Sequence, residues 1–274
     1  MSRFFSLMCL YTIKNQIKKL KIMKTVIIGG TGRIGSRLTG ILEQQGHNVI
    51  VAARSTGINT ISGEGLDEAL SNAQVVVDVS NAHAGDATAV LEFFEVSTRN
   101  LIAAEKRNGV AHHVVLSIVG VERMQQKGYF RAKQAQEKLV KKSGVPYTIV
   151  QATQFFEFLG NIAANGAKGE TIHLPAVSFQ PIAVDDVAAI LASVATSEPA
   201  NGTIAIAGPE KGRMEAIIKE YLKKMGDARS VLSDPDANYF GIELNDQSLV
   251  PVAGSNTRFG QINLETWFRQ QQRG

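Results

Sequence analysis

A glycine-rich segment is the first part of the chain with the spacing of a chemical site. Residues 29–35 read GGTGRIG and directly follow the short apolar run Thr25–Ile28. Glycine suits such a turn because it adopts dihedral angles that other residues avoid and lets the backbone approach a phosphate. Where a helix follows, its first N–H groups are oriented toward a pyrophosphate. The segment therefore predicts a dinucleotide-binding turn made of Gly29, Gly30, Thr31, Gly32, Arg33, Ile34 and Gly35.

The residue after the second predicted strand indicates which nicotinamide dinucleotide binds. An acidic side chain at this place would hydrogen-bond the free ribose hydroxyls of NAD. The chain instead has Arg54, followed by Ser55. A guanidinium pairs bidentately with a phosphate, so we expect NADP(H) in preference to NAD(H). The alternative interpretation is that Arg54 and Arg33 are solvated loop residues.

Ser117, Tyr129 and Lys133 form a second candidate set. Tyr129 and Lys133 stand four residues apart in a predicted helix and therefore share one face. A nearby ammonium lowers the pKa of a phenol, so we expect Tyr129 to exchange a proton near neutral pH. Ser117 closes a predicted strand at the carboxyl edge of the sheet, where ligands of open α/β sheets bind. The alternative is a Tyr-x-x-x-Lys spacing that arises by chance on a helix surface.

Three further residues complete the predicted cofactor site. Ser80 follows the apolar run Val75–Val79, and Thr153 and Phe155 lie in the segment Gln151–Phe156, which follows another predicted strand. The aromatic side chains of that segment either line a nicotinamide and substrate pocket or belong to the core, and the sequence favours neither. The five histidines show no metal-ligand spacing, so no metal site is expected.

Strand and helix patterns alternate along the first part of the chain. The predicted strands are Thr25–Ile28, Val49–Ala53, Val75–Val79, His113–Ile118 and Tyr147–Val150, and the predicted helices are Ile34–Gln45, Ala87–Arg107 and Phe130–Lys142. This alternation predicts an α/β fold with a Rossmann-type doubly wound parallel sheet. The predicted organisation is a leader extension outside the fold at 1–23, a dinucleotide-binding core at 24–153, and a smaller C-terminal portion at 154–274 that completes the sheet and forms a substrate pocket or lid.

Composition excludes several classes of protein. The chain has 274 residues, 44% of them hydrophobic and 20% charged, which suits a folded domain and not a disordered one. Its formal charge is +4, but residues 1–24 hold six Lys or Arg and no acid, so the remainder is slightly acidic. The charge therefore gives no reason to expect nucleic acid or a membrane as a partner. One cysteine, Cys9, excludes an intrachain disulfide, and we expect a cytoplasmic protein.

These motifs together resemble the NmrA-like group of atypical short-chain dehydrogenase/reductases. The resemblance is carried by GGTGRIG, by Ser117 with Tyr129-x-x-x-Lys133, and by the stretch SGVPYTIVQATQFFEF, and it runs from about Lys24 onward. It implies a Rossmann fold with NAD(P) bound at the glycine turn. It also implies Tyr129 as the acid/base, Lys133 as its pKa partner and ribose ligand, and Ser117 as the group that orients the substrate carbonyl.

Two functions are compatible with this resemblance. The first is an NADP(H)-dependent oxidoreductase that transfers a hydride to a small carbonyl, quinone or enone, with the small molecule as its partner. The second is a non-catalytic, redox-sensing regulator that binds NADP and a protein partner. The intact Ser117, Tyr129 and Lys133 set favours the enzyme, because a sensor needs no general acid. An epimerase acting on a sugar nucleotide is disfavoured by the lack of an evident diphosphate anchor in residues 154–274, and a homodimer stays open.

Overall fold

A parallel seven-stranded sheet organises the computed structural model, which describes residues 22–82, 86–126 and 128–272. All but the last two residues of the predicted leader, 1–23, lie outside the described residues. The strands follow the order β12-β9-β5-β4-β3-β1-β2, and each neighbouring pair is parallel. Their bounds are β1 Lys24–Ile28, β2 Asn48–Ala52, β3 Val75–Asp78, β4 His112–Ile118, β5 Tyr147–Ala152, β9 Gly202–Ala207 and β12 Thr257–Phe259.

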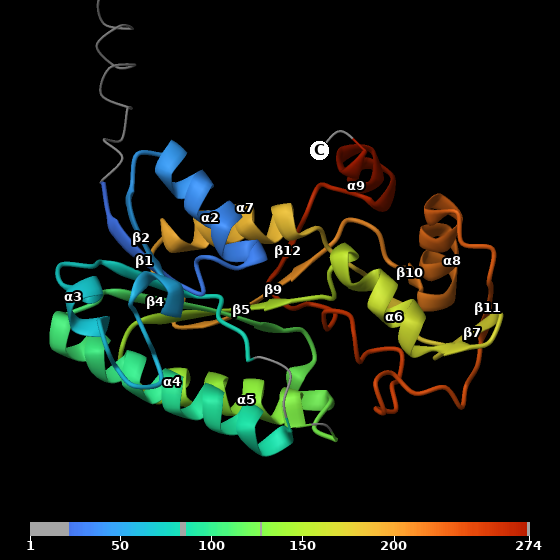
Figure 1. Ribbon diagram of the computed structural model, residues 1–274, viewed down its shortest axis with the longest axis horizontal. Coiled ribbons are helices and arrows are strands. Elements are labelled where there is room, and N and C mark those ends of the chain that lie inside the picture. Colours follow the sequence, from blue (N-terminus) through green and yellow to red (C-terminus); the bar gives the residue numbers. More distant parts are fainter. Residues whose placement is uncertain (1–21, 83–85, 127, 273–274) are drawn as a thin grey trace, which may run out of the picture.

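Helices cover both faces of this sheet. Helices α2 (Arg33–Gln44) and α7 (Val184–Ala195) pack together on one face, and α4 (Ala87–Asn108) and α5 (Gly128–Lys141) pack on the other (Figure 1). The short helix α3 (Leu66–Leu70) lies beside α4. Strand β3 is buried throughout because apolar helices lie on each side of it, as its continuous β-branched sequence predicts. The predicted Rossmann-type doubly wound fold is therefore confirmed.

Late segments of the chain return to this sheet. Strands β9 and β12 form one edge of it, and α7 covers a face that α2 also covers. Asp185 and Asp186 lie in the first turn of α7, where carboxylates complement the helix dipole. They also fix neighbours, because Asp185 pairs with Arg37 of α2 at 2.5 Å and Asp186 accepts the backbone N–H of Ile262 at 2.9 Å.

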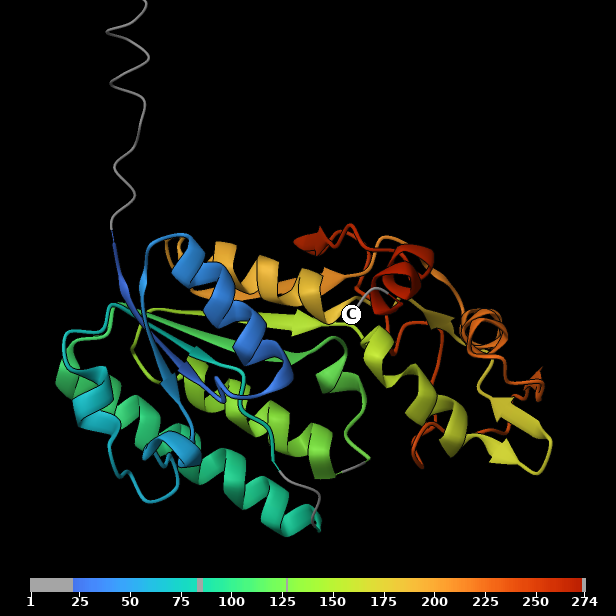
Figure 2. The same ribbon diagram turned by 45° about the horizontal axis from the view of Figure 1, so that its top comes forward.

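The remaining elements form a smaller C-terminal portion beyond the end of β5 (Figure 2). They comprise a three-stranded sheet, a two-stranded sheet and three helices around an apolar cluster that also includes Val121, Met124 and Phe130 of the preceding part of the chain. Their bounds are α6 Leu159–Asn165, β6 Ala167–Lys168, β7 Thr171–Leu174, β8 Ser178–Phe179, β10 Gly212–Arg213, α8 Met214–Met225, β11 Ser230–Ser233 and α9 Leu264–Gln271. Within the described part of the chain, no helix is both long enough and apolar enough to cross a membrane.

Candidate functional site

The glycine turn joins β1 to α2 at a point where no larger side chain fits. Gly29 has a φ of 78°, and a Cβ there would lie 2.9 Å from the Cα of Ser80. A Cβ on Gly35 would lie 2.3 Å from the carbonyl oxygen of Gly29 and 2.6 Å from the Cα of Gly30. Both are sterically forbidden approaches. Glycine therefore lets the start of α2 pack directly against the turn.

The N-terminus of α2 is open to an anion. Its N-cap is Gly32, which offers no side-chain cap, and no acidic residue occupies its first turn. The first amides of a helix need acceptors and carry the positive end of its dipole. Thr31, Gly32 and Arg33 are also exposed. This turn thus fits the pyrophosphate of a dinucleotide, as its sequence predicts.

Three hydroxyl groups stand unpaired at the carboxyl ends of neighbouring strands. Ser80 follows β3, Ser117 lies near the end of β4, and Thr153 follows β5. Their side-chain oxygens are buried and have no hydrogen-bond partner among the described residues. Leaving a buried polar atom unsatisfied costs about 1–3 kcal/mol. Three such atoms at one sheet edge indicate groups that pair with a ligand.

These hydroxyls open onto a cleft of about 620 Å³. The cleft is lined by all three predicted catalytic residues and by four of the predicted cofactor residues, which are Ser117, Tyr129, Lys133, Ile34, Ser80, Thr153 and Phe155. The other residues of the 29–35 turn do not line it and follow the end of β1, and Arg54 and Ser55 do not line it and follow the end of β2. Arg54 and Ser55 are exposed, in a 3-10 turn that directly follows the second strand. The structure therefore brings the two predicted sets to the same edge of the sheet.

Tyr129 lies at the start of α5, and its ring is edge-on to Phe94 and Phe130, with centres 6.1 and 5.8 Å away. Its hydroxyl donates a hydrogen bond to Oδ1 of Asn81 at 2.9 Å. Desolvation by these apolar neighbours raises the pKa of Tyr129 to about 12, although the bond to Asn81 acts in the opposite direction. The prediction that Lys133 lowers the pKa of Tyr129 is therefore wrong.

The physical reason lies in where Lys133 points. Its side chain is 4% exposed, and its ammonium donates hydrogen bonds to the carbonyl oxygen of Leu116, at 2.7 Å, and to the amide oxygen of Gln136. It also lies 4.7 Å from the ring centre of Phe94. Burial lowers the pKa of Lys133 to about 8, and the negative charges of Asp78 and Glu137 oppose this shift. A buried ammonium needs acceptors, and it finds them in the protein.

A buried polar chain connects Lys133 to strand β3. The amide nitrogen of Gln136 donates to Oδ2 of Asp78 at 2.8 Å, and Oδ1 of Asp78 accepts the backbone N–H of Ser80 at 2.9 Å. Gln136 and Asp78 are 1% and 3% exposed. The sequence analysis identified neither residue. This chain fixes Lys133 relative to the loop that carries Ser80 and Asn81.

The sequence left open whether the aromatic residues after β5 line a pocket or belong to the core, and the structure shows one of each. Phe155 lines the cleft, whereas Phe156 is 3% exposed and belongs to the core of the C-terminal portion. Sequence analysis missed the cleft residues that come from far along the chain, which are Tyr239, Phe240 and Ile242. It also missed Asn81, the acceptor for Tyr129. The only sequence signal for Tyr239, Phe240 and Ile242 is the short aromatic and apolar run that they form.

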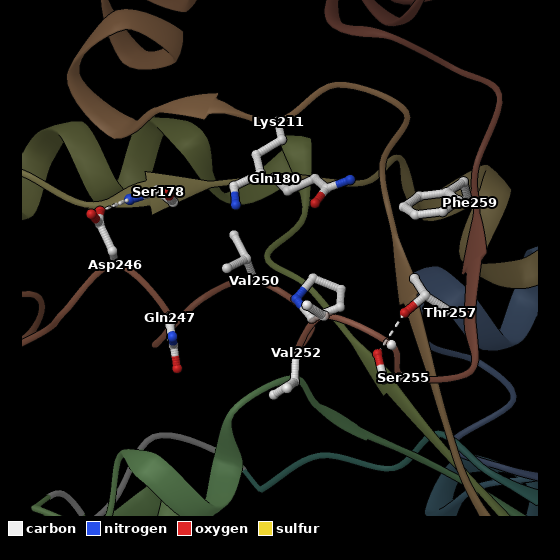
Figure 3. A pocket seen from close by; sticks show the side chains of 13 residues that line it. Ser178, Gln180, Lys211, Asp246, Gln247, Val250, Val252, Ser255, Thr257 and Phe259 are labelled. Carbon is white, nitrogen blue, oxygen red and sulfur yellow. Dashed lines mark hydrogen bonds between the residues drawn. The ribbon is translucent and has the colours of Figure 1, made fainter.

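A second cavity of about 630 Å³ lies at the β12 edge of the molecule (Figure 3). None of the predicted site residues lines it. In it, the side chain of Asp246 accepts the backbone N–H of Ser178, and the hydroxyls of Ser255 and Thr257 share a hydrogen bond. Across the described ranges, no group of three His, Cys, Asp or Glu side chains is placed to hold a metal ion.

Comparison with a family model relates this chain to NAD(P)H-binding proteins. Residues 29–198 match the NAD(P)H-binding family, which is more than half of the chain. The photosystem II assembly factor Ycf39 of Synechocystis is 28% identical over 151 residues, covering 50% of this chain and 46% of that protein. The chain thus spans about half the length of that relative.

One further relative and one solved structure extend the comparison. The (4-alkanoyl-5-oxo-2,5-dihydrofuran-3-yl)methyl phosphate reductase of Streptomyces griseus is 29% identical over 202 residues, 68% of each chain. The solved UDP-glucose 4-epimerase of Thermotoga maritima superposes with a TM-score of 0.70 at 14% identity, covering 92% of this chain and 100% of that one. At that identity the likeness shows a shared fold. The family match and the seven-stranded parallel sheet agree on an NAD(P)H-binding Rossmann domain.

Proposed function

This chain belongs to the NAD(P)H-binding family, and on that premise we propose that it is an NADP(H)-dependent oxidoreductase. Its proposed reaction is hydride transfer to a small carbonyl, quinone or enone. The observation that carries the proposal is the meeting, in one cleft, of unpaired buried hydroxyls with Tyr129 and Lys133. The reductase of Streptomyces griseus, a relative over 68% of the chain, supports the same class of activity.

The glycine turn and the N-terminus of α2 would hold the cofactor pyrophosphate, and Arg54 would pair with the 2′-phosphate of NADP. The bound cofactor supplies the hydride. Ile34, Ser80, Thr153 and Phe155 extend the proposed binding surface from the turn into the cleft. A guanidinium at the end of β2 favours the phosphorylated ribose because it offers two parallel hydrogen bonds.

Ser117 and Tyr129 act on the substrate oxygen in this proposal. The unpaired hydroxyl of Ser117 donates a hydrogen bond to the carbonyl and orients it. Tyr129 holds its proton at neutral pH, since its pKa is raised to about 12, and it can donate that proton to a developing alkoxide. Asn81 holds the phenol in place until substrate binds.

Lys133 serves as a positioning residue in the same site. Its ammonium bonds the carbonyl oxygen of Leu116, the residue before Ser117, and so fixes the end of β4. Through Gln136 and Asp78 it also fixes the loop after β3. One buried ammonium therefore holds two segments of the proposed site, the end of β4 and the loop after β3, in fixed positions.

A non-catalytic regulator that binds NADP and a protein partner is the second candidate. The observation that favours it is the 28% identity to a protein described as an assembly factor. A survey of NADPH oxidation by the purified protein across quinones, aldehydes and enones separates the two. Turnover with at least one class supports the oxidoreductase. Tight NADPH binding without turnover of any acceptor would refute it and favour the regulator.

A further inference from the structure

One wall of the cleft is carried by a strained turn. The backbone N–H of Tyr239 donates to the carbonyl oxygen of Ile242 at 2.9 Å, and that of Ile242 donates to Tyr239 at 3.0 Å. The two central residues, Phe240 and Gly241, have φ angles of 50° and 76°. Positive φ at both central positions defines a type I′ turn, whose first position prefers Asn, Asp or Gly. Phenylalanine is strained there because its Cβ crowds the backbone.

The surroundings hold Phe240 in this conformation. Oδ1 of Asn165, the last residue of α6, accepts the backbone N–H of Phe240 at 3.0 Å. The flanking side chains of Tyr239 and Ile242 are 3% and 1% exposed, so the turn is anchored on both sides. The ring of Phe158 lies 5.5 Å from that of Phe240, with the two planes tilted by 30°. Strained backbone of this kind persists where neighbours fix it, and it gathers at ligand sites.

The cleft that these rings line is aromatic and poor in accessible charge. Phe155, Phe158, Tyr239 and Phe240 all line it. Among the described residues of its lining, Lys133 alone carries a formal charge, and its buried ammonium is already bonded to Leu116 and Gln136. Among these described residues, a phosphate or carboxylate on a substrate would therefore find no accessible charged partner. Aromatic faces suit a flat, uncharged ring instead.

We propose that Phe240 determines the substrate specificity of the cleft. With Phe158 it forms an aromatic surface that selects planar, uncharged, conjugated rings, the quinone class, over aliphatic carbonyls of similar size. The proposal rests on the proposed oxidoreductase function and narrows its substrate. It also gives a reason for retaining a phenylalanine at a turn position that favours asparagine.

The substitution Phe240→Asn removes the aromatic ring and keeps the conformation of the turn. Asparagine before Gly241 is the preferred type I′ pair, so the variant should melt no lower than the wild type. The test compares binding of 2-naphthol with binding of its saturated counterpart, decahydro-2-naphthol, by calorimetry in the presence of NADP⁺. We expect the wild type to prefer the aromatic probe by about 10-fold, and the variant to lose that preference. A wild type without preference, or a variant that keeps it, would overturn the proposal.

Further variants decide between a specific and a general effect. Phe259→Asn changes an exposed aromatic residue that does not line the cleft, and it should keep the wild-type preference. Phe158→Leu should lose the preference, and it decides the question if Phe240→Asn does not fold. Asn165→Asp retains an acceptor for Phe240 and should bind like the wild type, whereas Asn165→Ala should weaken the preference. The opposite result for either Phe158→Leu or Asn165→Ala would count against the proposal.

The binding test does not depend on turnover, so two failures can be told apart. Ring preference without NADPH oxidation of any acceptor would refute the oxidoreductase but not the selectivity of the cleft. Oxidation of NADPH by aliphatic aldehydes as fast as by quinones, with no preference for 2-naphthol, would refute only the role of Phe240.

Discussion

Replacing Lys133 by methionine should change how the stability of the protein depends on pH. Burial lowers the pKa of Lys133 from 10.5 to about 8. The folded protein therefore releases this proton near pH 8, while the unfolded chain keeps it until about pH 10.5. Between these values the unfolded chain binds one more proton, so the free energy of unfolding rises with pH. The contribution is lost as the pH falls through about 8.

The size of this effect follows from the shift. One proton corresponds to a slope of about 1.36 kcal/mol per pH unit, so the wild type should gain about 2 kcal/mol between about pH 8 and 9.5. Lys133→Met replaces the lysine with an unbranched, uncharged side chain of similar length, so the variant should lack this gain in stability. At any single pH the variant also lacks the two hydrogen bonds to Leu116 and Gln136. The test therefore compares the change in stability between two pH values, and not the stability at one pH.

Urea unfolding of both proteins at pH 7.5 and 9.5 measures the difference. The wild type should gain on the variant as the pH rises. Lys138→Met, which changes an exposed lysine on the same helix, is the matched control and should follow the wild type. Parallel pH profiles for the wild type and Lys133→Met would refute the lowered pKa of the buried Lys133 ammonium.

Two other substitutions test the cofactor site. Arg54→Ala should reduce a preference for NADP(H) over NAD(H) of roughly 10- to 150-fold, the equivalent of a charge-assisted hydrogen bond of about 1.5–3 kcal/mol; calorimetric titration with both cofactors checks this, and an unchanged ratio would contradict it. Gly35→Ala places a Cβ 2.3 Å from the carbonyl oxygen of Gly29, so it should destabilise the fold by about 1–3 kcal/mol and weaken cofactor binding. Denaturant unfolding and calorimetry on this variant test both parts, and wild-type values would show that the turn can move aside.

The sequence predicted the parts of the site whose structure is set locally. The run from Thr25 to Gly35 is a strand, a tight turn and the start of a helix, and each step is fixed by neighbouring residues. Helix α4 begins at Ala87, as its pattern predicts, and ends at Asn108, one residue after the predicted end. Strand bounds elsewhere differ by one or two residues, as at β5, which continues to Ala152. Such ends depend on pairing with strands from elsewhere in the chain.

Contacts between distant segments were beyond the reach of the sequence. The i,i+4 spacing places Tyr129 and Lys133 on one face, but it does not show that Lys133 turns to the carbonyl oxygen of Leu116. The partner of Tyr129 is Asn81, 48 residues earlier. The turn at Phe240 could not be predicted, because its sequence lacks the Asn-Gly signature of a type I′ turn. The rest of the fold holds Phe240 at a positive φ that phenylalanine disfavours. These tertiary contacts determine the pKa values of Tyr129 and Lys133 and the shape of the cleft.

The most direct test of the proposed function is the turnover of Tyr129→Phe with an acceptor that the wild type reduces. This variant keeps the ring and removes the proton donor, so NADPH should bind with unchanged affinity while kcat falls by roughly 10²–10⁴-fold. Steady-state NADPH oxidation and a calorimetric titration on the same preparation measure both quantities. A variant that binds NADPH and turns over at the wild-type rate would contradict the account, since the acid it assigns would then play no part in the reaction.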